Sequence, residues 1–125
     1  MPLEIKQTVP LVRILDVGKA REFYLDYLGF TVDWEHRYGA NFPLYMQVSR
    51  GGLTLHLTEH YGDCLPGSTV FLRATGLDEF HAELPAKDYC YYKPGIETTE
   101  YRSRCLELRD PFGNKLRFDE ALEPA

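Results

Sequence analysis

The feature that most constrains the fold is a stretch near the C-terminus, where apolar and polar residues alternate on both sides of a turn. It reads Cys105-Leu-Glu-Leu-Arg-Asp-Pro-Phe-Gly-Asn-Lys-Leu-Arg-Phe118, and the turn is Asp110-Pro-Phe-Gly113. Such alternation around a turn with Asp, Pro and Gly predicts a β-hairpin. A spacing of two places the apolar side chains on one face, namely Leu106, Leu108, Leu116 and Phe118. The other face is chemically mixed, which predicts a sheet with a helix on one side and a ligand or solvent on the other.

Length and charge restrict the class of protein. A chain of 125 residues forms one domain whose core needs neither disulfides nor metals. The net charge of -5 argues against a nucleic-acid partner, because binding phosphates requires a basic surface, and it leaves room for a cationic ligand. The cysteines are widely spaced, so we expect free thiols in a reducing compartment. Without a signal-peptide pattern or a membrane-length apolar stretch, we expect a cytoplasmic protein and no membrane partner.

The first half of the chain predicts a strand, a helix and three further strands. A strand over residues 9–15 precedes a helix over residues 17–28, which Asp16 caps at its start and Gly29 ends. Strands over residues 30–38, 42–50 and 53–59 follow, and Gly51-Gly52 joins the last two.

After a polar loop over residues 60–67 the same order of elements restarts. A strand over residues 69–75 leads to a short helix that opens with the capping box Thr75-Gly-Leu-Asp78 and ends near Pro85. A strand around residues 91–101 and the closing hairpin complete the chain, and Tyr89-Cys-Tyr-Tyr92 is a candidate edge strand at a subunit contact. We expect one α+β domain of two β-α-β-β-β modules, over about residues 5–62 and 67–120.

This duplication, the Asp16…Ala20…Phe23-Tyr24…Leu28-Gly-Phe30 run and the Asp110-Pro-Phe-Gly-Asn114 hairpin resemble the vicinal oxygen chelate superfamily over residues 9–119. That group includes glyoxalase I, extradiol dioxygenases, and fosfomycin- and bleomycin-resistance proteins. The Arg50-Gly-Gly-Leu53 hairpin leading to Glu59-His-Tyr-Gly62, and the ending Leu116-Arg-Phe118, most resemble the bleomycin-resistance branch. The resemblance implies concave sheets that form a half-barrel. Because such a half-barrel leaves apolar edges, we expect a homodimer in which modules are exchanged between chains.

The resemblance also implies where a metal would be held. Metal-using members place ligands on the first, fourth and last strands, at positions that correspond here to Val9, His56 and Arg117. Valine has no lone pair, and arginine is a permanent cation without an acceptor. We therefore expect no metal, no cofactor and no catalytic residues, since the chemistry of the superfamily requires the metal as its electrophile.

Some other residues are types that can bind metals or act as nucleophiles, but their positions in the sequence do not favour such roles. His56 and His60 would lie about 13 Å apart on one strand, too far to share an ion, so His56 is expected to make hydrogen bonds in a cavity wall. Cys105 has no assignable histidine partner, which favours an inert thiol over a nucleophile. Glu107 and Arg117 lie on the same face of the two strands of the hairpin, and they can pair across it if the register allows. Whether they form a structural ion pair or contact a ligand stays open.

The aromatic content, 14% of the residues, gives the strongest functional signal. Flat aromatic walls with carboxylates suit a planar or cationic ligand, although core packing explains aromatic residues as well. We predict metal-independent binding of a small aromatic or cationic molecule, with possible sequestration of an antibiotic such as bleomycin. The expected ligand-binding residues are Trp34, Tyr38, Phe42, Tyr45, His56, Glu59, His60, Tyr101, Glu107 and Arg117. The alternatives are a metal-dependent glyoxalase- or dioxygenase-type enzyme with a rearranged ligand set, and a module with no ligand role.

Overall fold

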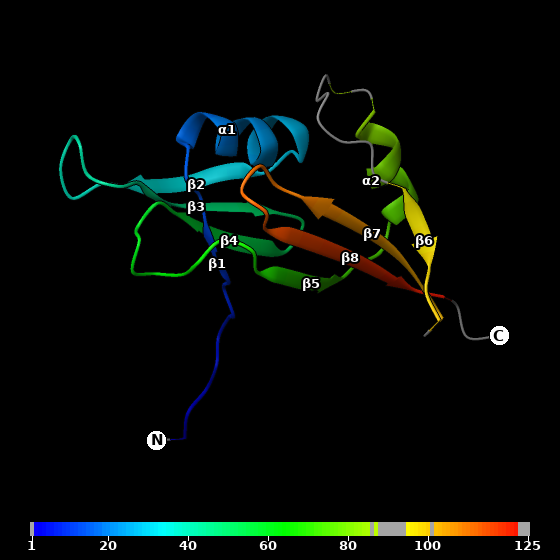
Figure 1. The fold of residues 1–125 in the computed structure, drawn as a ribbon. Coiled ribbons are helices and arrows are strands. Elements are labelled where there is room, and N and C mark those ends of the chain that lie inside the picture. Colours follow the sequence, from blue (N-terminus) through cyan, green and yellow to red (C-terminus); the bar gives the residue numbers. More distant parts are fainter. Residues whose placement is uncertain (1, 86, 88–94, 101, 123–125) are drawn as a thin grey trace.

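The chain forms two four-stranded sheets, each with a helical segment on one face (Figure 1). The computed structural model describes residues 2–85, 87, 95–100 and 102–122. The first module contains β1 (Leu11–Arg13), α1 (Val17–Arg21), η1 (Glu22–Tyr27), β2 (Thr31–His36), β3 (Tyr45–Arg50) and β4 (Leu53–Thr58). The second module contains β5 (Thr69–Arg73), α2 (Leu77–Glu83), β6 (Ile96–Thr98), β7 (Ser103–Arg109) and β8 (Lys115–Ala121). The predicted α+β fold class is confirmed.

The two sheets have the same topology, as a duplication requires. Their strand orders are β1-β4-β3-β2 and β5-β8-β7-β6, with the first and last strands of each module parallel. In Figure 1 the sheets lie side by side, and the N-terminal segment extends away from both. No helix in the described part of the chain is long and apolar enough to cross a membrane.

The first helix begins as predicted, because the Asp16 carboxylate accepts a hydrogen bond from the Lys19 amide at 2.9 Å. It does not continue as an α-helix to residue 28, since residues 22–27 form a π-helix. The Leu28 amide, for example, donates to the Phe23 carbonyl at 2.9 Å. Phe23, Tyr24 and Tyr27 of this segment are all buried. Gly29, at φ +78°, ends the helix as predicted.

The predicted capping box of the second helix is wrong. The N-cap is Gly76, in the left-handed region at φ +76°, and no side chain caps the helix. Asp78 instead accepts two hydrogen bonds from the Arg104 guanidinium, at 2.6 and 2.8 Å. An arginine on the neighbouring sheet competes better for a carboxylate than a backbone amide does, because its fork binds both oxygens at once.

Several predicted strands are longer than the observed ones. The first, at residues 9–15, is reduced to β1, and those at 30–38 and 42–50 are reduced to β2 and β3. Of the strand expected around residues 91–101, the structure shows β6, while residues 91–94 and 101 lie outside the described residues. The tract Tyr89-Cys-Tyr-Tyr92 lies outside them as well.

The closing hairpin has the predicted apolar face, with Leu106 opposite Phe118 and Leu108 opposite Leu116. Its turn also joins the two modules. The buried Asp110 carboxylate accepts a hydrogen bond from the Tyr24 hydroxyl of η1 at 2.7 Å. Asn114 donates from its side-chain nitrogen to the Arg13 carbonyl of β1 at 2.7 Å. The turn that organises the second sheet therefore also positions it against the first.

Candidate ligand-binding site

A cavity of about 380 Å³ lies at the end of the first sheet where β2, β3 and the loop after β4 meet. It is lined by Trp34, His36, Tyr38, Tyr45, His60 and Asp63. Four of these six were predicted ligand-binding residues, and neither lysine nor arginine is among the six. The volume is within the range of small-molecule sites. Aromatic walls and one carboxylate give the cavity an apolar, electron-rich interior.

The aromatic rings stand in two orientations around this space. Trp34 and Tyr45 are nearly parallel, at 10° and with ring centroids 5.9 Å apart. Tyr38 stands edge-on to His36 at 4.7 Å and to His60 at 6.0 Å. Trp34 keeps 42% of its surface exposed and Tyr38 keeps 74%. Large aromatic rings that remain this exposed to solvent provide faces on which a planar ligand can stack.

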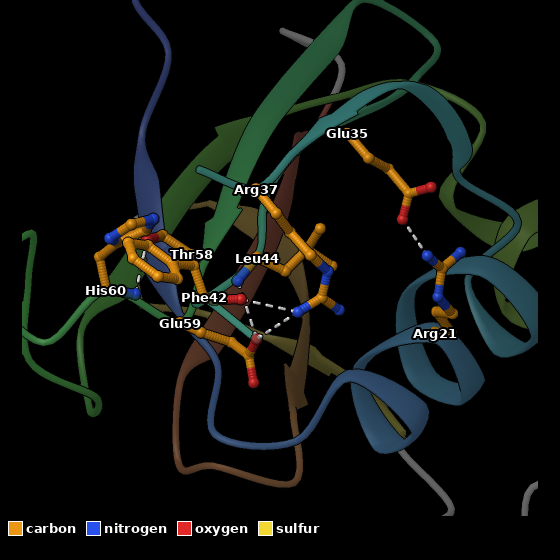
Figure 2. A network of polar contacts seen from close by, with 8 residues as sticks. All are labelled: Arg21, Glu35, Arg37, Phe42, Leu44, Thr58, Glu59 and His60. Carbon is orange, nitrogen blue, oxygen red and sulfur yellow. Dashed lines mark hydrogen bonds and ion pairs between the residues drawn. The ribbon is translucent and has the colours of Figure 1, made fainter. Parts of the chain in front are cut away.

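A β-bulge in β2 aims Trp34 at the cavity. Val32 is opposite Val48 and Trp34 is opposite Gln47, so Asp33 is an extra residue in β2. Strict alternation would place Val32 and Trp34 on one face. The extra residue instead lets Val32 pack against the core and leaves Trp34 exposed. Glu35, the next residue, forms an ion pair with Arg21 of α1 and so lies on the helix side (Figure 2).

His56 lies behind the aromatic wall and does not line the cavity. Its Nδ1 is 2.6 Å from the Tyr45 hydroxyl and its Nε2 is 3.0 Å from Oε1 of Gln47. The imidazole also stands edge-on to Trp34, with centroids 5.3 Å apart. Burial lowers the pKa of His56, because the imidazolium is poorly solvated there. His56 thus holds the rings of the wall in place with both nitrogens occupied.

The lowered pKa of His56 predicts a pH-dependent stability. The unfolded chain binds the proton at higher pH than the folded chain does, so acidification favours unfolding. The free energy of unfolding should fall as the pH drops below about 6.5 and level off once the folded-state pKa is passed. Urea denaturation between about pH 7.5 and 5 should show a shallower pH dependence in His56→Asn than in the wild type. Equal slopes would contradict this assignment.

The loop after β4 supplies the carboxylate of the cavity, and it is not the expected one. The Glu59 carboxylate accepts a hydrogen bond from the Leu44 amide at 2.9 Å and lies 4.0 Å from the Arg37 guanidinium (Figure 2). Glu59 therefore fastens the segment before β3 and does not line the cavity. Asp63 does, and it also accepts a hydrogen bond from the Thr58 hydroxyl at 2.7 Å. Sequence reasoning missed Asp63 because nothing in a polar loop distinguishes one carboxylate from another.

His60 reaches the cavity although β4 ends before it. Its amide donates to the Thr58 hydroxyl at 3.0 Å, which turns the chain after the strand (Figure 2). Its ring then lies 6.3 Å from that of Tyr45. Phe42 is exposed but does not line this cavity, and Tyr101 lies outside the described residues.

The remaining predicted residues are on the second sheet. Arg117 donates to the Glu107 carboxylate at 2.8 and 3.1 Å, so the two residues form the cross-strand ion pair that the sequence left open, and these hydrogen bonds lower the pKa of Glu107. Burial raises the pKa of the neighbouring Cys105 thiol, so it is a poor nucleophile at neutral pH. These residues do not line the cavity of the first sheet.

The residues at the family's metal positions do not fit a divalent ion. Val9 offers no ligating atom, and both ring nitrogens of His56 make hydrogen bonds within the sheet. Arg117 is a cation bonded to Glu107. Within the described residues there is also no group of three or more His, Cys, Asp or Glu side chains that could hold a metal elsewhere.

Comparison with known proteins decides the family. Residues 2–124 match the family described as "Glyoxalase superfamily protein". The chain belongs to the glyoxalase superfamily. This confirms the membership that the sequence motifs indicated. No curated protein sequence matches this superfamily member.

Solved structures with the same fold include proteins that bind antibiotics. One is a bleomycin-binding protein in complex with bleomycin, at 26% identity and a TM-score of 0.67, with 93% of this chain and 98% of that chain covered. Another is a bleomycin resistance determinant encoded on transposon Tn5, at 22% identity and a TM-score of 0.70, with coverage of 94% and 98%. A glyoxalase-related enzyme from Clostridium phytofermentans has a TM-score of 0.76 at 18% identity, with coverage of 96% and 98%.

Proposed function

We propose that this glyoxalase superfamily protein binds a small, planar, cationic molecule in the cavity of the first sheet, without a metal. The observation that carries the proposal is the lining itself, in which three large aromatic rings and the Asp63 carboxylate stand beside two histidines, with neither lysine nor arginine among the described lining residues. Sequestration of an antibiotic is the role that fits such binding. A protein of the same fold, 26% identical, has been crystallised with bleomycin.

The side chains that line the cavity determine the expected free energy of ligand binding. A cation over an aromatic face gains about 0.5–2 kcal/mol, and more when water is excluded. Stacking of a planar group on Trp34 or Tyr45 adds the burial of its apolar surface. The Asp63 carboxylate favours a positively charged ligand over a neutral one of the same shape, and the negative net charge of the chain acts in the same direction.

The protonation states of the potentially reactive side chains support binding without covalent chemistry. Burial, and then the nearby Asp63 and Cys64, raise the pKa of Tyr45, so its phenol stays protonated and is a weak base. The same burial effect raises the pKa values of Cys64 and Cys105. A site that transfers protons or attacks an electrophile would need these shifts in the opposite direction.

We further propose that the protein acts as a cytoplasmic homodimer with modules exchanged between chains. Within the described chain, β1 pairs only with β4 and β5 pairs only with β8, so the outer edge of each strand is unpaired. Phe71 of β5 and Leu11 of β1 also stay exposed, at 45% and 37%. A second copy would cover both the edges and these side chains.

Replacing Asp63 by asparagine tests the role of charge. We expect Asp63→Asn to weaken phenyltrimethylammonium binding about fivefold, by removing roughly 1 kcal/mol of attraction to the cation, while tert-butylbenzene, its neutral isostere, binds unchanged. Glu59→Gln is the matched control, because Glu59 lies outside the cavity. Both ligands can be titrated by the fluorescence of the single tryptophan, Trp34. Equal losses for the two ligands, or no binding of either, would count against the proposal.

A further inference from the structure

Behind the aromatic wall runs a chain of hydrogen bonds that ends on a residue outside the cavity. Tyr45 Oη is 2.6 Å from His56 Nδ1, and His56 Nε2 is 3.0 Å from Gln47 Oε1. The Gln47 side-chain amide then donates to Asp33 Oδ2 at 3.0 Å. The Ser49 hydroxyl donates to the other Asp33 oxygen, Oδ1, also at 3.0 Å. Each bond crosses from one strand to its neighbour within β2, β3 and β4.

The direction of every bond in this chain follows from its last member. A carboxylate only accepts hydrogen bonds, so Gln47 must turn its NH₂ group toward Asp33 and its carbonyl oxygen toward His56. A carbonyl oxygen also only accepts, so His56 must carry its proton on Nε2. Its Nδ1 is then a bare lone pair, and the Tyr45 hydroxyl must donate to it.

The direction decides what Tyr45 offers to a ligand. Its ring lines the cavity, and its only proton is committed to His56, so the hydroxyl presents lone pairs alone. We propose that Asp33 is a specificity-determining residue, which orients the Asp33–Gln47–His56–Tyr45 relay so that Tyr45 accepts hydrogen bonds from the ligand. A ligand that carries N–H donors is therefore favoured over one that presents acceptors at this wall. This last step rests on the proposed function, whereas the direction of the relay does not.

Two independent features agree with this assignment. The β-bulge places the extra residue, Asp33, beside β3, where it meets both Gln47 and Ser49. Burial lowers the pKa of His56 and raises that of Tyr45, which favours a neutral imidazole and a protonated phenol.

The relay is tested by reversing its last member. In Asp33→Lys an ammonium, which only donates, replaces an acceptor, so Gln47 should turn around and His56 should move its proton from Nε2 to Nδ1. Nitrogen-15 chemical shifts of the His56 ring report the tautomer directly and need no ligand. We expect the Nε2–H form in the wild type and the Nδ1–H form in Asp33→Lys. Glu35→Lys, with the same charge change on the helix side, should keep the Nε2–H form.

A ligand pair completes the test. Benzylammonium carries N–H donors and benzyltrimethylammonium carries none, although both are cations. We expect the wild type to prefer benzylammonium about fivefold, in line with one hydrogen bond, and Asp33→Lys to lose that preference. An Nδ1–H tautomer in the wild type, an unchanged tautomer in Asp33→Lys, or equal affinities in the wild type would overturn the inference. Failure of both ligands to bind, with the tautomers as expected, would instead refute the proposed function.

Discussion

Asp110→Ala is expected to lower the free energy of unfolding by about 3–5 kcal/mol, the largest effect of any single substitution considered. The Asp110 carboxylate is 4% exposed and accepts hydrogen bonds from the Tyr24 hydroxyl, the amides of Phe112 and Asn114, and the Asn114 side chain. Alanine removes the acceptor of all four donors at once. Buried donors without partners are costly, and the hydrogen bond from Tyr24, one of the two links that this turn makes between the modules, is lost.

Urea denaturation followed by circular dichroism would measure this loss. Tyr24→Phe, which removes one donor and keeps the ring, should cost only about 1 kcal/mol. Asp26→Ala is the matched control, because Asp26 is exposed on the first helix and its loss should stay within about 0.5 kcal/mol. A loss in Asp110→Ala no larger than in Asp26→Ala would show that the turn does not join the modules.

Trp34→Ala is expected to weaken bleomycin binding at least about 30-fold, which corresponds to roughly 2 kcal/mol. Trp34 supplies the largest ring system of the cavity lining and is parallel to Tyr45. Its removal takes away both a stacking surface and the best ring for a cation. Stability should change much less, since the side chain is 42% exposed.

Phe42→Ala is the matched control for this experiment. Phe42 is also an exposed aromatic residue of the first module, at 55%, but it does not line the cavity. Isothermal titration of both variants with bleomycin should show a large loss for Trp34→Ala and affinity within a factor of two of wild type for Phe42→Ala. Equal effects in the two variants would place the ligand elsewhere.

Period-two patterns were the most reliable part of the sequence. They predicted which side chains of the closing hairpin share a face, including Glu107 and Arg117 on the mixed face, because this follows from alternation around one turn. The N-cap at Asp16 and the stop at Gly29 also followed from local chemistry. Features of this kind depend on residues that are close together in the sequence, so the sequence alone is enough to predict them.

Features that depend on contacts between residues distant in sequence could not be predicted in this way. The capping box at Thr75 failed because Arg104, distant in sequence, binds the Asp78 carboxylate. No glycine or proline marks the bulge at Asp33 in the sequence, and the bulge depends on which side chains of β2 pack against the core. Asp63 enters the cavity through the path of a loop. The aromatic wall could be predicted in part, together with His56 behind it and His60 beside it, whereas Asp33, Gln47 and Asp63 could not.

The most direct test of metal-free binding is a calorimetric titration of chelator-treated protein with metal-free and copper-bound bleomycin, with metal analysis of the same protein before the chelator is added. We predict saturable binding without added metal, no stoichiometric metal in the protein, and loss of the binding heat in Trp34→Ala. Stoichiometric zinc, nickel, manganese or iron that is lost in His56→Ala, with no binding heat in its absence, would contradict the account.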